Sequence, residues 1–138
     1  MSTNSLVLIV DDFPDALDIY QSYLSFKGYQ VITASSGPHA VALARSDRPA
    51  IIFMDIRMPI VTGTDAMQEL RRDPSFRDVP IIALTAHALD DERSEALRAG
   101  FDEVLPKPCN PDDLIAAIER LVGPVVTDSS PSASAASG

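Results

Sequence analysis

The sequence alternates short aliphatic runs with amphipathic stretches from one end to the other, and this alternation limits the folds open to it. The aliphatic runs are LVLIV (6–10), YQVITA (29–34), AIIFM (50–54), IIAL (81–84) and EVL (103–105). Between them, apolar residues recur at helical spacing, as in Phe13, Leu17, Tyr20 and Leu24. Five such strand–helix units predict a parallel sheet with helices on both faces.

The composition of the runs indicates their places in this sheet. Runs 6–10, 50–54 and 81–84 are uniformly apolar, as expected of strands covered on both faces. Run 29–34 contains Gln30 and Thr33, and run 103–105 is short and acidic, so we expect these two at the edges. The order 2-1-3-4-5 meets this condition. We therefore predict a flavodoxin-like (βα)5 doubly wound parallel sheet.

Prolines and capping residues mark the predicted helix starts. Prolines stand where first helical turns would begin, at Pro14, Pro38 and Pro111. Thr62 with Asp65 matches a capping box, and Asn110 is a good N-cap. The segment LDDERSEALRAG (89–100) has helical character but few apolar residues. We expect it to be the least anchored helix and therefore a mobile element.

The 138 residues suffice for one domain of ordinary size. We assign residues 1–4 to a short N-terminal extension and residues 5–122 to the domain. Beyond them, residues 123–138 read GPVVTDSSPSASAASG. Because this composition is rich in Ser, Ala and Pro, it predicts a disordered tail.

Charge and apolar content exclude several classes of partner. The formal net charge is −9, so direct binding of nucleic acid is not expected. No apolar stretch approaches the roughly 20 residues that cross a bilayer, and the N-terminus lacks the basic start of a signal peptide. Cys109 is the single cysteine, which excludes an internal disulfide and favours a packed thiol. These features predict a reduced, cytoplasmic protein that does not bind membranes.

Polar residues stand at or just beyond the carboxyl ends of four predicted strands. They are Asp11, Asp12, Asp55, Thr85 and Lys107. The carboxyl ends of parallel strands share one edge, where such sheets bind ligands. Each residue alone has a structural explanation, and Asp12 in particular could cap the helix that begins near Pro14. Together they predict one crevice with three carboxylates, a hydroxyl and an ammonium group.

This set of groups suits a hard divalent cation, because Mg²⁺ prefers oxygen ligands and offsets the repulsion between Asp11 and Asp12. A carboxylate beside Mg²⁺ can attack phosphorus, so Asp55 is the candidate for an aspartyl phosphate. Lys107 would be a second cation for the phosphoryl group. Thr85 and the Ala86 backbone N–H would donate hydrogen bonds to its oxygens.

Four motifs, VDD (10–12), MDIRMP (54–59), LTA (84–86) and LPKP (105–108), resemble those of response-regulator receiver domains of two-component signalling. The resemblance covers about residues 5–122. It implies that Asp55 takes a phosphoryl group from a phosphohistidine on a sensor histidine kinase or a histidine phosphotransfer protein. The phosphoryl group would then switch a surface for a downstream protein partner, or pass on in a relay. Such a chain is a phosphoacceptor and not an enzyme with other substrates.

The same resemblance implies a set of metal ligands. Asp12 and Asp55 would bind Mg²⁺ directly, and Asp11 would act mainly through water. The backbone carbonyl of Arg57 would be the third protein ligand, which leaves the Arg57 side chain open to variation.

The resemblance also bears on the residues around Lys107 and Thr85. It implies a cis peptide bond before Pro108, which is plausible because cis bonds are essentially confined to proline. Receiver domains generally carry an aromatic residue three positions before the lysine, which turns inward when the threonine moves. That position is Val104 here, so we expect it to pack and not to rotate. His87 belongs either to the rim of the crevice or to an exposed loop.

The sequence leaves two alternative functions open. A phosphatase of the haloacid-dehalogenase type also combines an aspartate nucleophile with Mg²⁺, a threonine and a lysine. That family places its nucleophile in a DxD pattern, whereas Asp55 is followed by Ile56 and Arg57. The second alternative is a non-phosphorylated scaffold with the same fold, which would have no need of the intact set of polar residues.

Overall fold

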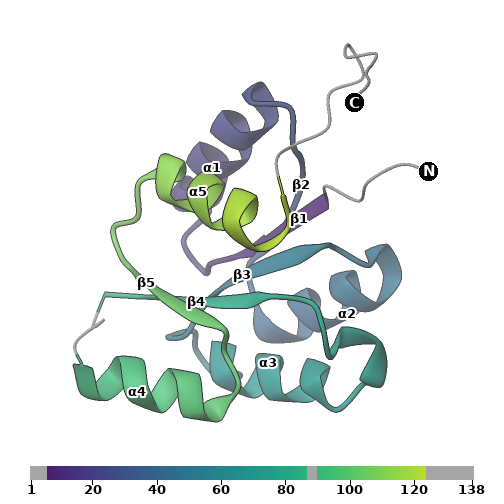
Figure 1. The fold of residues 1–138 in the computed structure, drawn as a ribbon, viewed down its shortest axis with the longest axis vertical. Helices are drawn as coiled ribbons and strands as arrows, with labels where there is room; N and C mark the ends of the chain where they lie inside the picture. Colours follow the sequence, from purple (N-terminus) through teal and green to yellow (C-terminus); the bar gives the residue numbers. More distant parts are fainter. Residues whose placement is uncertain (1–5, 87–89, 124–138) are drawn as a thin grey trace.

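The computed structural model describes residues 6–86 and 90–123, which form five strands alternating with five α-helices (Figure 1). The strands are β1 (Leu6–Val10), β2 (Gln30–Ala34), β3 (Ile51–Asp55), β4 (Ile81–Thr85) and β5 (Glu103–Pro106). The helices are α1 (Pro14–Phe26), α2 (Gly37–Asp47), α3 (Gly63–Arg71), the 3-10 helix η1 (Pro74–Phe76), α4 (Asp90–Ala99) and α5 (Pro111–Leu121). His87, the predicted extension 1–4 and the predicted tail after Gly123 lie outside the described residues.

The strands pair in parallel in the order β2-β1-β3-β4-β5, which confirms the predicted flavodoxin-like topology. Every residue of β3 and β4 is buried. By contrast, β2 begins with the exposed Gln30, and only Val104 of β5 is buried. The two runs with polar character are therefore the edge strands, as expected. Asp55 pairs with Leu84, and Thr85 pairs with Pro106, so the ends of β3, β4 and β5 lie close together.

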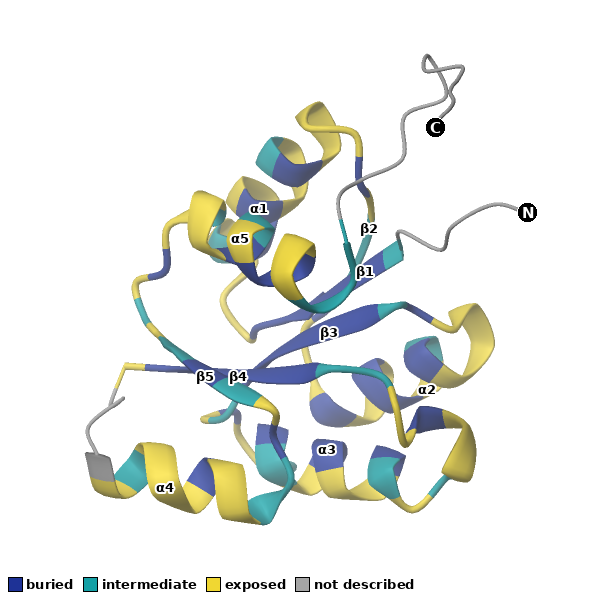
Figure 2. Cartoon of the chain, viewed as in Figure 1, coloured by how far each residue is buried: buried dark blue, intermediate teal, exposed yellow. Residues whose placement is uncertain are grey.

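Helices cover both faces of the sheet, and Figure 2 shows the buried strands between them. On one face, α1 and α5 bury Leu24 and Leu114 against Phe53 of β3. On the other face, α2, α3 and α4 pack over a cluster that includes Leu70 and Met54. Phe53 and Met54 point to opposite faces because successive side chains of a strand alternate. No helix in the described parts of the chain is long and apolar enough to cross a bilayer.

The helix starts agree with the predicted caps, with one correction at α1. Thr62 and Asp65 form a capping box at α3, and the Asn110 side chain accepts the Asp112 N–H at 2.9 Å. Phe13, however, lies before α1 and is 58% exposed. Its predicted place in the apolar stripe of α1 is wrong, because the residue before a proline is pushed to extended backbone, here before Pro14.

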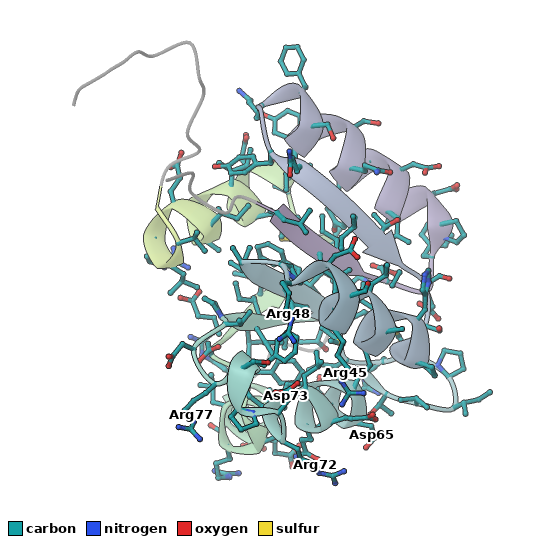
Figure 3. All side chains as sticks on the ribbon, turned by 90° about the vertical axis from the view of Figure 1, so that its right-hand side faces the viewer. Arg45, Arg48, Asp65, Arg72, Asp73 and Arg77 are labelled. Carbon is teal, nitrogen blue, oxygen red and sulfur yellow. The ribbon has the colours of Figure 1, made fainter. Side chains whose placement is uncertain are left out.

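The surface over α2, α3 and η1 carries charges of both signs (Figure 3). The charged side chains labelled there are Arg45, Arg48, Asp65, Arg72, Asp73 and Arg77. Arg45 lies 3.6 Å from Glu69, and the guanidinium of Arg48 stacks over the Phe76 ring. Hydrogen bonds from Ser75 lower the pKa of Asp73, and Arg48 adds a smaller effect in the same direction. Because Asp65, Asp73 and Glu69 lie among the arginines, this surface is not a single basic patch.

Helix α4 has little apolar anchoring. Among its described side chains, Ala96 is the buried one, at 3% exposed, while Leu97 is 40% exposed. This agrees with the prediction that α4 is the least anchored helix, since few of its contacts are apolar.

Arg71, the last residue of α3, connects the loops near the C-terminal end of α4. Its Nη1 donates to the carbonyl oxygens of Phe76 at 2.8 Å and Val79 at 2.9 Å. Its Nη2 donates to the carbonyl oxygen of Gly100 at 3.2 Å and pairs with Asp102 at 2.7 Å. Gly100 directly follows α4, so this end of the helix is fixed by several hydrogen bonds.

Candidate functional site

Three buried polar residues mark the carboxyl edge of the sheet. Within the described residues, the buried polar or charged side chains are Asp11, Asp55 and Thr85, which are 0%, 4% and 1% exposed. Asp11 follows β1, while Asp55 and Thr85 are the last residues of β3 and β4. Since these strands are parallel neighbours, the three residues share one edge, as the sequence predicts.

Lys107, which lies between β5 and α5, joins two of these groups. Its Nζ lies 2.9 Å from Asp11 Oδ2 and 3.2 Å from Asp55 Oδ2. The second oxygen of each carboxylate accepts a backbone N–H, Asp11 Oδ1 from Phe13 at 2.9 Å and Asp55 Oδ1 from Arg57 at 3.1 Å. The turns after β1 and β3 therefore aim both carboxylates at Lys107.

Asp12 is exposed and completes an acidic cluster at this edge. Carboxylate oxygens of Asp11, Asp12 and Asp55 all lie within 4.8 Å of one another. The N-cap of α1 is Phe13, and no side-chain cap bond is formed there. The alternative that Asp12 caps α1 is therefore wrong, and its carboxylate instead belongs to the cluster.

Burial and charge act in opposite directions within the cluster. Burial raises the pKa of Asp55, Lys107 lowers it and Asp11 raises it again, with a net upward shift. Burial alone would lower the pKa of Lys107, but the hydrogen bond and charge of Asp11, with Asp55, raise it overall. With all four groups ionised, three carboxylates and one ammonium leave two negative charges. An oxygen-rich site with this charge suits a divalent cation.

The sequence matches the response regulator receiver domain family over residues 7–119. The chain belongs to this family. Response regulator SaeR of Staphylococcus aureus strain USA300 is 39% identical over 116 residues, which cover 84% of this chain and 50% of SaeR. The receiver domain thus spans about half the length of the curated relatives that it matches. Membership of this family decides against the haloacid-dehalogenase-type phosphatase.

Solved structures share this fold closely. Chemotaxis protein CheY4 of Vibrio cholerae superposes with a TM-score of 0.81 at 30% identity, over 86% of this chain and 99% of CheY4. The receiver domain of sensor histidine kinase PA1611 from Pseudomonas aeruginosa PAO1 superposes with a TM-score of 0.79 at 35% identity, over 88% and 99% of the two chains. That structure holds a magnesium ion in its active-site cleft.

Glu92 on α4 contacts the receiver domain's site in a way that the sequence did not indicate. The Thr85 hydroxyl donates to Glu92 Oε1 at 2.8 Å, and Arg57 Nη2 pairs with Glu92 Oε2 at 2.7 Å. Glu92 is one of several charged residues in the predicted 89–100 helix. No spacing rule distinguishes it, since its partners come from other elements.

Gly63 is a second residue that sequence reasoning missed. A Cβ atom at this position would lie 2.0 Å from the carbonyl oxygen of Asp55, so the backbone of α3 approaches the end of β3 too closely for any side chain. The Gly63 N–H also donates to the Ile56 carbonyl oxygen at 2.9 Å. The available signal was a glycine directly after the predicted cap Thr62.

Of the remaining predicted site residues, Ala86 lies at this edge and Val104 lies in the core. Ala86 follows Thr85 and is exposed. Val104 is 3% exposed and pairs with Ala83, which places it in the core as expected for a packing residue. The peptide bond between Lys107 and Pro108 is cis, as the family resemblance implied.

Cys109 is a packed thiol, as predicted. It is 7% exposed, and its Sγ lies 3.7 Å from the Asn110 carbonyl oxygen. Burial, with a smaller contribution from Asp113, raises the pKa of Cys109 to about 11. The group is therefore an uncharged thiol at neutral pH, which makes it a poor nucleophile.

Proposed function

We propose that this receiver domain accepts a phosphoryl group on Asp55 from a phosphohistidine of a sensor histidine kinase or a histidine phosphotransfer protein. The observation that carries the proposal is the position of Asp55. Its nearly buried carboxylate lies at the end of a central strand, 3.2 Å from Lys107 and within the acidic cluster with Asp11 and Asp12.

The residues of the cluster fit Mg²⁺ as the cofactor. The donors are carboxylate oxygens, and the three carboxylates carry two more negative charges than Lys107 neutralises. Asp12 is accessible from solvent. Asp12, Asp55 and the backbone carbonyl of Arg57 would hold the ion, with Asp11 acting mainly through water. When bound, Mg²⁺ neutralises charge on the phosphoryl oxygens and on the attacking carboxylate.

Each residue of the site has its own role in phosphoryl transfer. An Asp55 oxygen attacks phosphorus, the bond from phosphorus to the histidine nitrogen breaks, and its electron pair remains on the imidazole, which takes up a proton. Lys107 holds Asp55 in place and offers its ammonium group to the negative phosphoryl oxygens. Thr85 and the Ala86 N–H then donate hydrogen bonds to the transferred group.

The phosphorylated domain acts through a changed protein-interaction surface. It contacts a downstream protein partner in the cytoplasm or hands the phosphoryl group on in a relay. Beyond its own phosphorylation and slow dephosphorylation, it catalyses no reaction. The absence of direct nucleic-acid binding stays a prediction from the net charge of −9.

Labelling with acetyl phosphate tests the proposed acceptor. With Mg²⁺, the parent protein should take up one phosphoryl group that is stable to acid and labile to base, and Asp55→Asn should take up none. The matched control is Asp18→Asn on the exposed side of α1, which makes the same chemical change away from the cluster and should be labelled like the parent. Equal labelling of Asp55→Asn and the parent would refute the assignment. No labelling of the parent would favour the non-phosphorylated scaffold.

A further inference from the structure

Glu92 connects the site to α4 through two different side chains. One carboxylate oxygen accepts the Thr85 hydroxyl at 2.8 Å, and the other accepts Arg57 Nη2 at 2.7 Å. Resting on the proposed function, we infer that Glu92 is a positioning residue that holds the Thr85 hydroxyl in the unphosphorylated protein. A phosphoryl group on Asp55 takes this hydroxyl away from Glu92 and so releases the first turn of α4.

The competition follows from the chemistry of the hydroxyl group. A threonine hydroxyl has a single O–H proton to donate, so Thr85 serves either Glu92 or a phosphoryl oxygen, not both. Both acceptors are anionic and form strong, charge-assisted hydrogen bonds. Thr85 is 1% exposed, so its hydroxyl is exchanged between acceptors inside the protein and not with bulk water. Glu92 therefore opposes phosphorylation, and phosphorylation opposes the contact between Glu92 and Thr85.

Arg57 links this contact to the phosphoacceptor strand. Its backbone N–H binds Asp55 Oδ1 at 3.1 Å, while its side chain binds Glu92. One residue therefore aims the Asp55 carboxylate and also holds the acid that binds Thr85. The ends of β3 and β4 and the first turn of α4 are joined through a single carboxylate.

Because α4 is weakly packed, loss of the contact between Glu92 and Thr85 can displace the helix. Ala96 is the buried side chain among the described residues of the helix, so few apolar contacts hold its N-terminal half. A groove separates α3 and α4, and it is lined by Ile56, Thr64, Glu92, Glu95, Ala96 and Ala99. Arg93 Nη1 also donates to the Val104 carbonyl oxygen, at 3.4 Å. A helix with a groove beside it and one buried side chain among its described residues can shift when the shorter contact of Glu92 with Thr85 is lost. Val104, fixed in the core, does not provide such a movement.

Binding of beryllofluoride, a phosphoryl mimic, in the presence of Mg²⁺ tests this inference. Glu92→Gln keeps the shape of the side chain but makes its bond to Thr85 a neutral one. We expect it to bind beryllofluoride about fivefold more tightly than the parent, since charged hydrogen bonds are roughly twice as strong as neutral ones. The matched control is Glu95→Gln, one turn further along α4 and lining the same groove, which should bind like the parent.

The same substitution made in a Thr85→Val variant distinguishes the loss of the hydrogen bond from the loss of the negative charge. In Thr85→Val there is no hydroxyl to compete for, so adding Glu92→Gln should leave beryllofluoride affinity unchanged. A fivefold effect that persists in Thr85→Val would mean that Glu92 acts by long-range repulsion, and the inference would be overturned. Equal affinity of Glu92→Gln and the parent would overturn it as well, while leaving Asp55 as the acceptor.

Hydrogen exchange of the unphosphorylated proteins gives an independent readout. Glu92→Gln should speed amide exchange at residues 94–97, whose N–H groups bond within the helix, relative to Glu95→Gln, because the first turn has lost its contact with Thr85. Unchanged exchange there would show that Glu92 does not hold the helix. A parent that binds no beryllofluoride and takes no label from acetyl phosphate would instead refute the proposed function, and the competition with it.

Discussion

Helices α4 and α5 flank the edge strand β5 in the chain, but different forces hold them. Helix α5 buries Leu114, Ala117 and Ile118 against the sheet. Helix α4 buries Ala96 among its described side chains and reaches the site through Glu92. Apolar burial does not depend on the charge state of the site, whereas a bond between a carboxylate and a hydroxyl does. We therefore expect α5 to be a constant support and α4 to be the element that shifts under the proposed phosphorylation.

The largest predicted effect is on the free energy of unfolding, when a leucine is replaced by alanine in each of the two helices. Leu114 on α5 is 0% exposed, and Leu97 on α4 is 40% exposed. Leu114→Ala should lower the free energy of unfolding by about 3 kcal/mol, because it leaves a cavity in the core. Leu97→Ala should change it by less than about 1 kcal/mol. Denaturant unfolding of both variants beside the parent measures the difference, and equal losses would contradict the contrast between the helices.

The second largest predicted effect is the stabilisation of the folded domain by Mg²⁺, which also tests the difference between α4 and α5. At 100 times its dissociation constant, Mg²⁺ should stabilise the folded domain by about 2.7 kcal/mol. Amides of α5 that exchange only through global unfolding should show this full increase. Amides of α4 should show less, because a local opening of α4 leaves the acidic cluster intact.

The variant Asp12→Ala supplies the control for the magnesium experiment. It removes one carboxylate of the cluster and should abolish the increase at α5, while relieving repulsion from Asp11 in the metal-free protein. An undiminished increase in Asp12→Ala would mean that the ion binds elsewhere.

The smallest expected effect is a pattern of amide chemical shifts with and without beryllofluoride. Changes should be large at Thr85, Ala86 and residues 90–98, and small at residues 103–105 and throughout α5. Val104 has a β-branched side chain with one strongly preferred rotamer and too little reach to follow a moving Thr85. Large changes at Val104 without changes in α4 would place the switch in β5 and contradict the proposed role of α4.

The sequence predicted the sheet well because strand burial leaves a direct trace in composition. Uniformly apolar runs became the central strands, and the runs with Gln30 or acidic neighbours became the edges. Once the strands are parallel, the places of Asp11, Asp55 and Thr85 at one edge follow from the topology alone.

Contacts between elements that are distant in the sequence could not be predicted from it. The exposed Phe13 looked like part of a helical stripe, because periodicity does not locate a helix start to the residue. Gly63 is needed for an approach to the Asp55 carbonyl, which only tertiary packing creates. Glu92 meets Thr85 because α4 lies beside the end of β4, and no local sequence pattern encodes that placement.

The hydrogen bonds around Arg71 determine what kind of motion is open to α4. At its C-terminal end, the Gly100 carbonyl accepts from Arg71, and the Ala99 carbonyl accepts from Gln68 Nε2 at 3.3 Å. The other end is attached to the site by Glu92. The bonds from Arg71 and Gln68 do not depend on Thr85, so they stay when Glu92 loses the hydroxyl. We therefore expect Gly100 to act as a pivot and the first turn of α4 to move farthest. A partner that contacts this first turn would therefore sense a larger displacement than one bound beside Gly100.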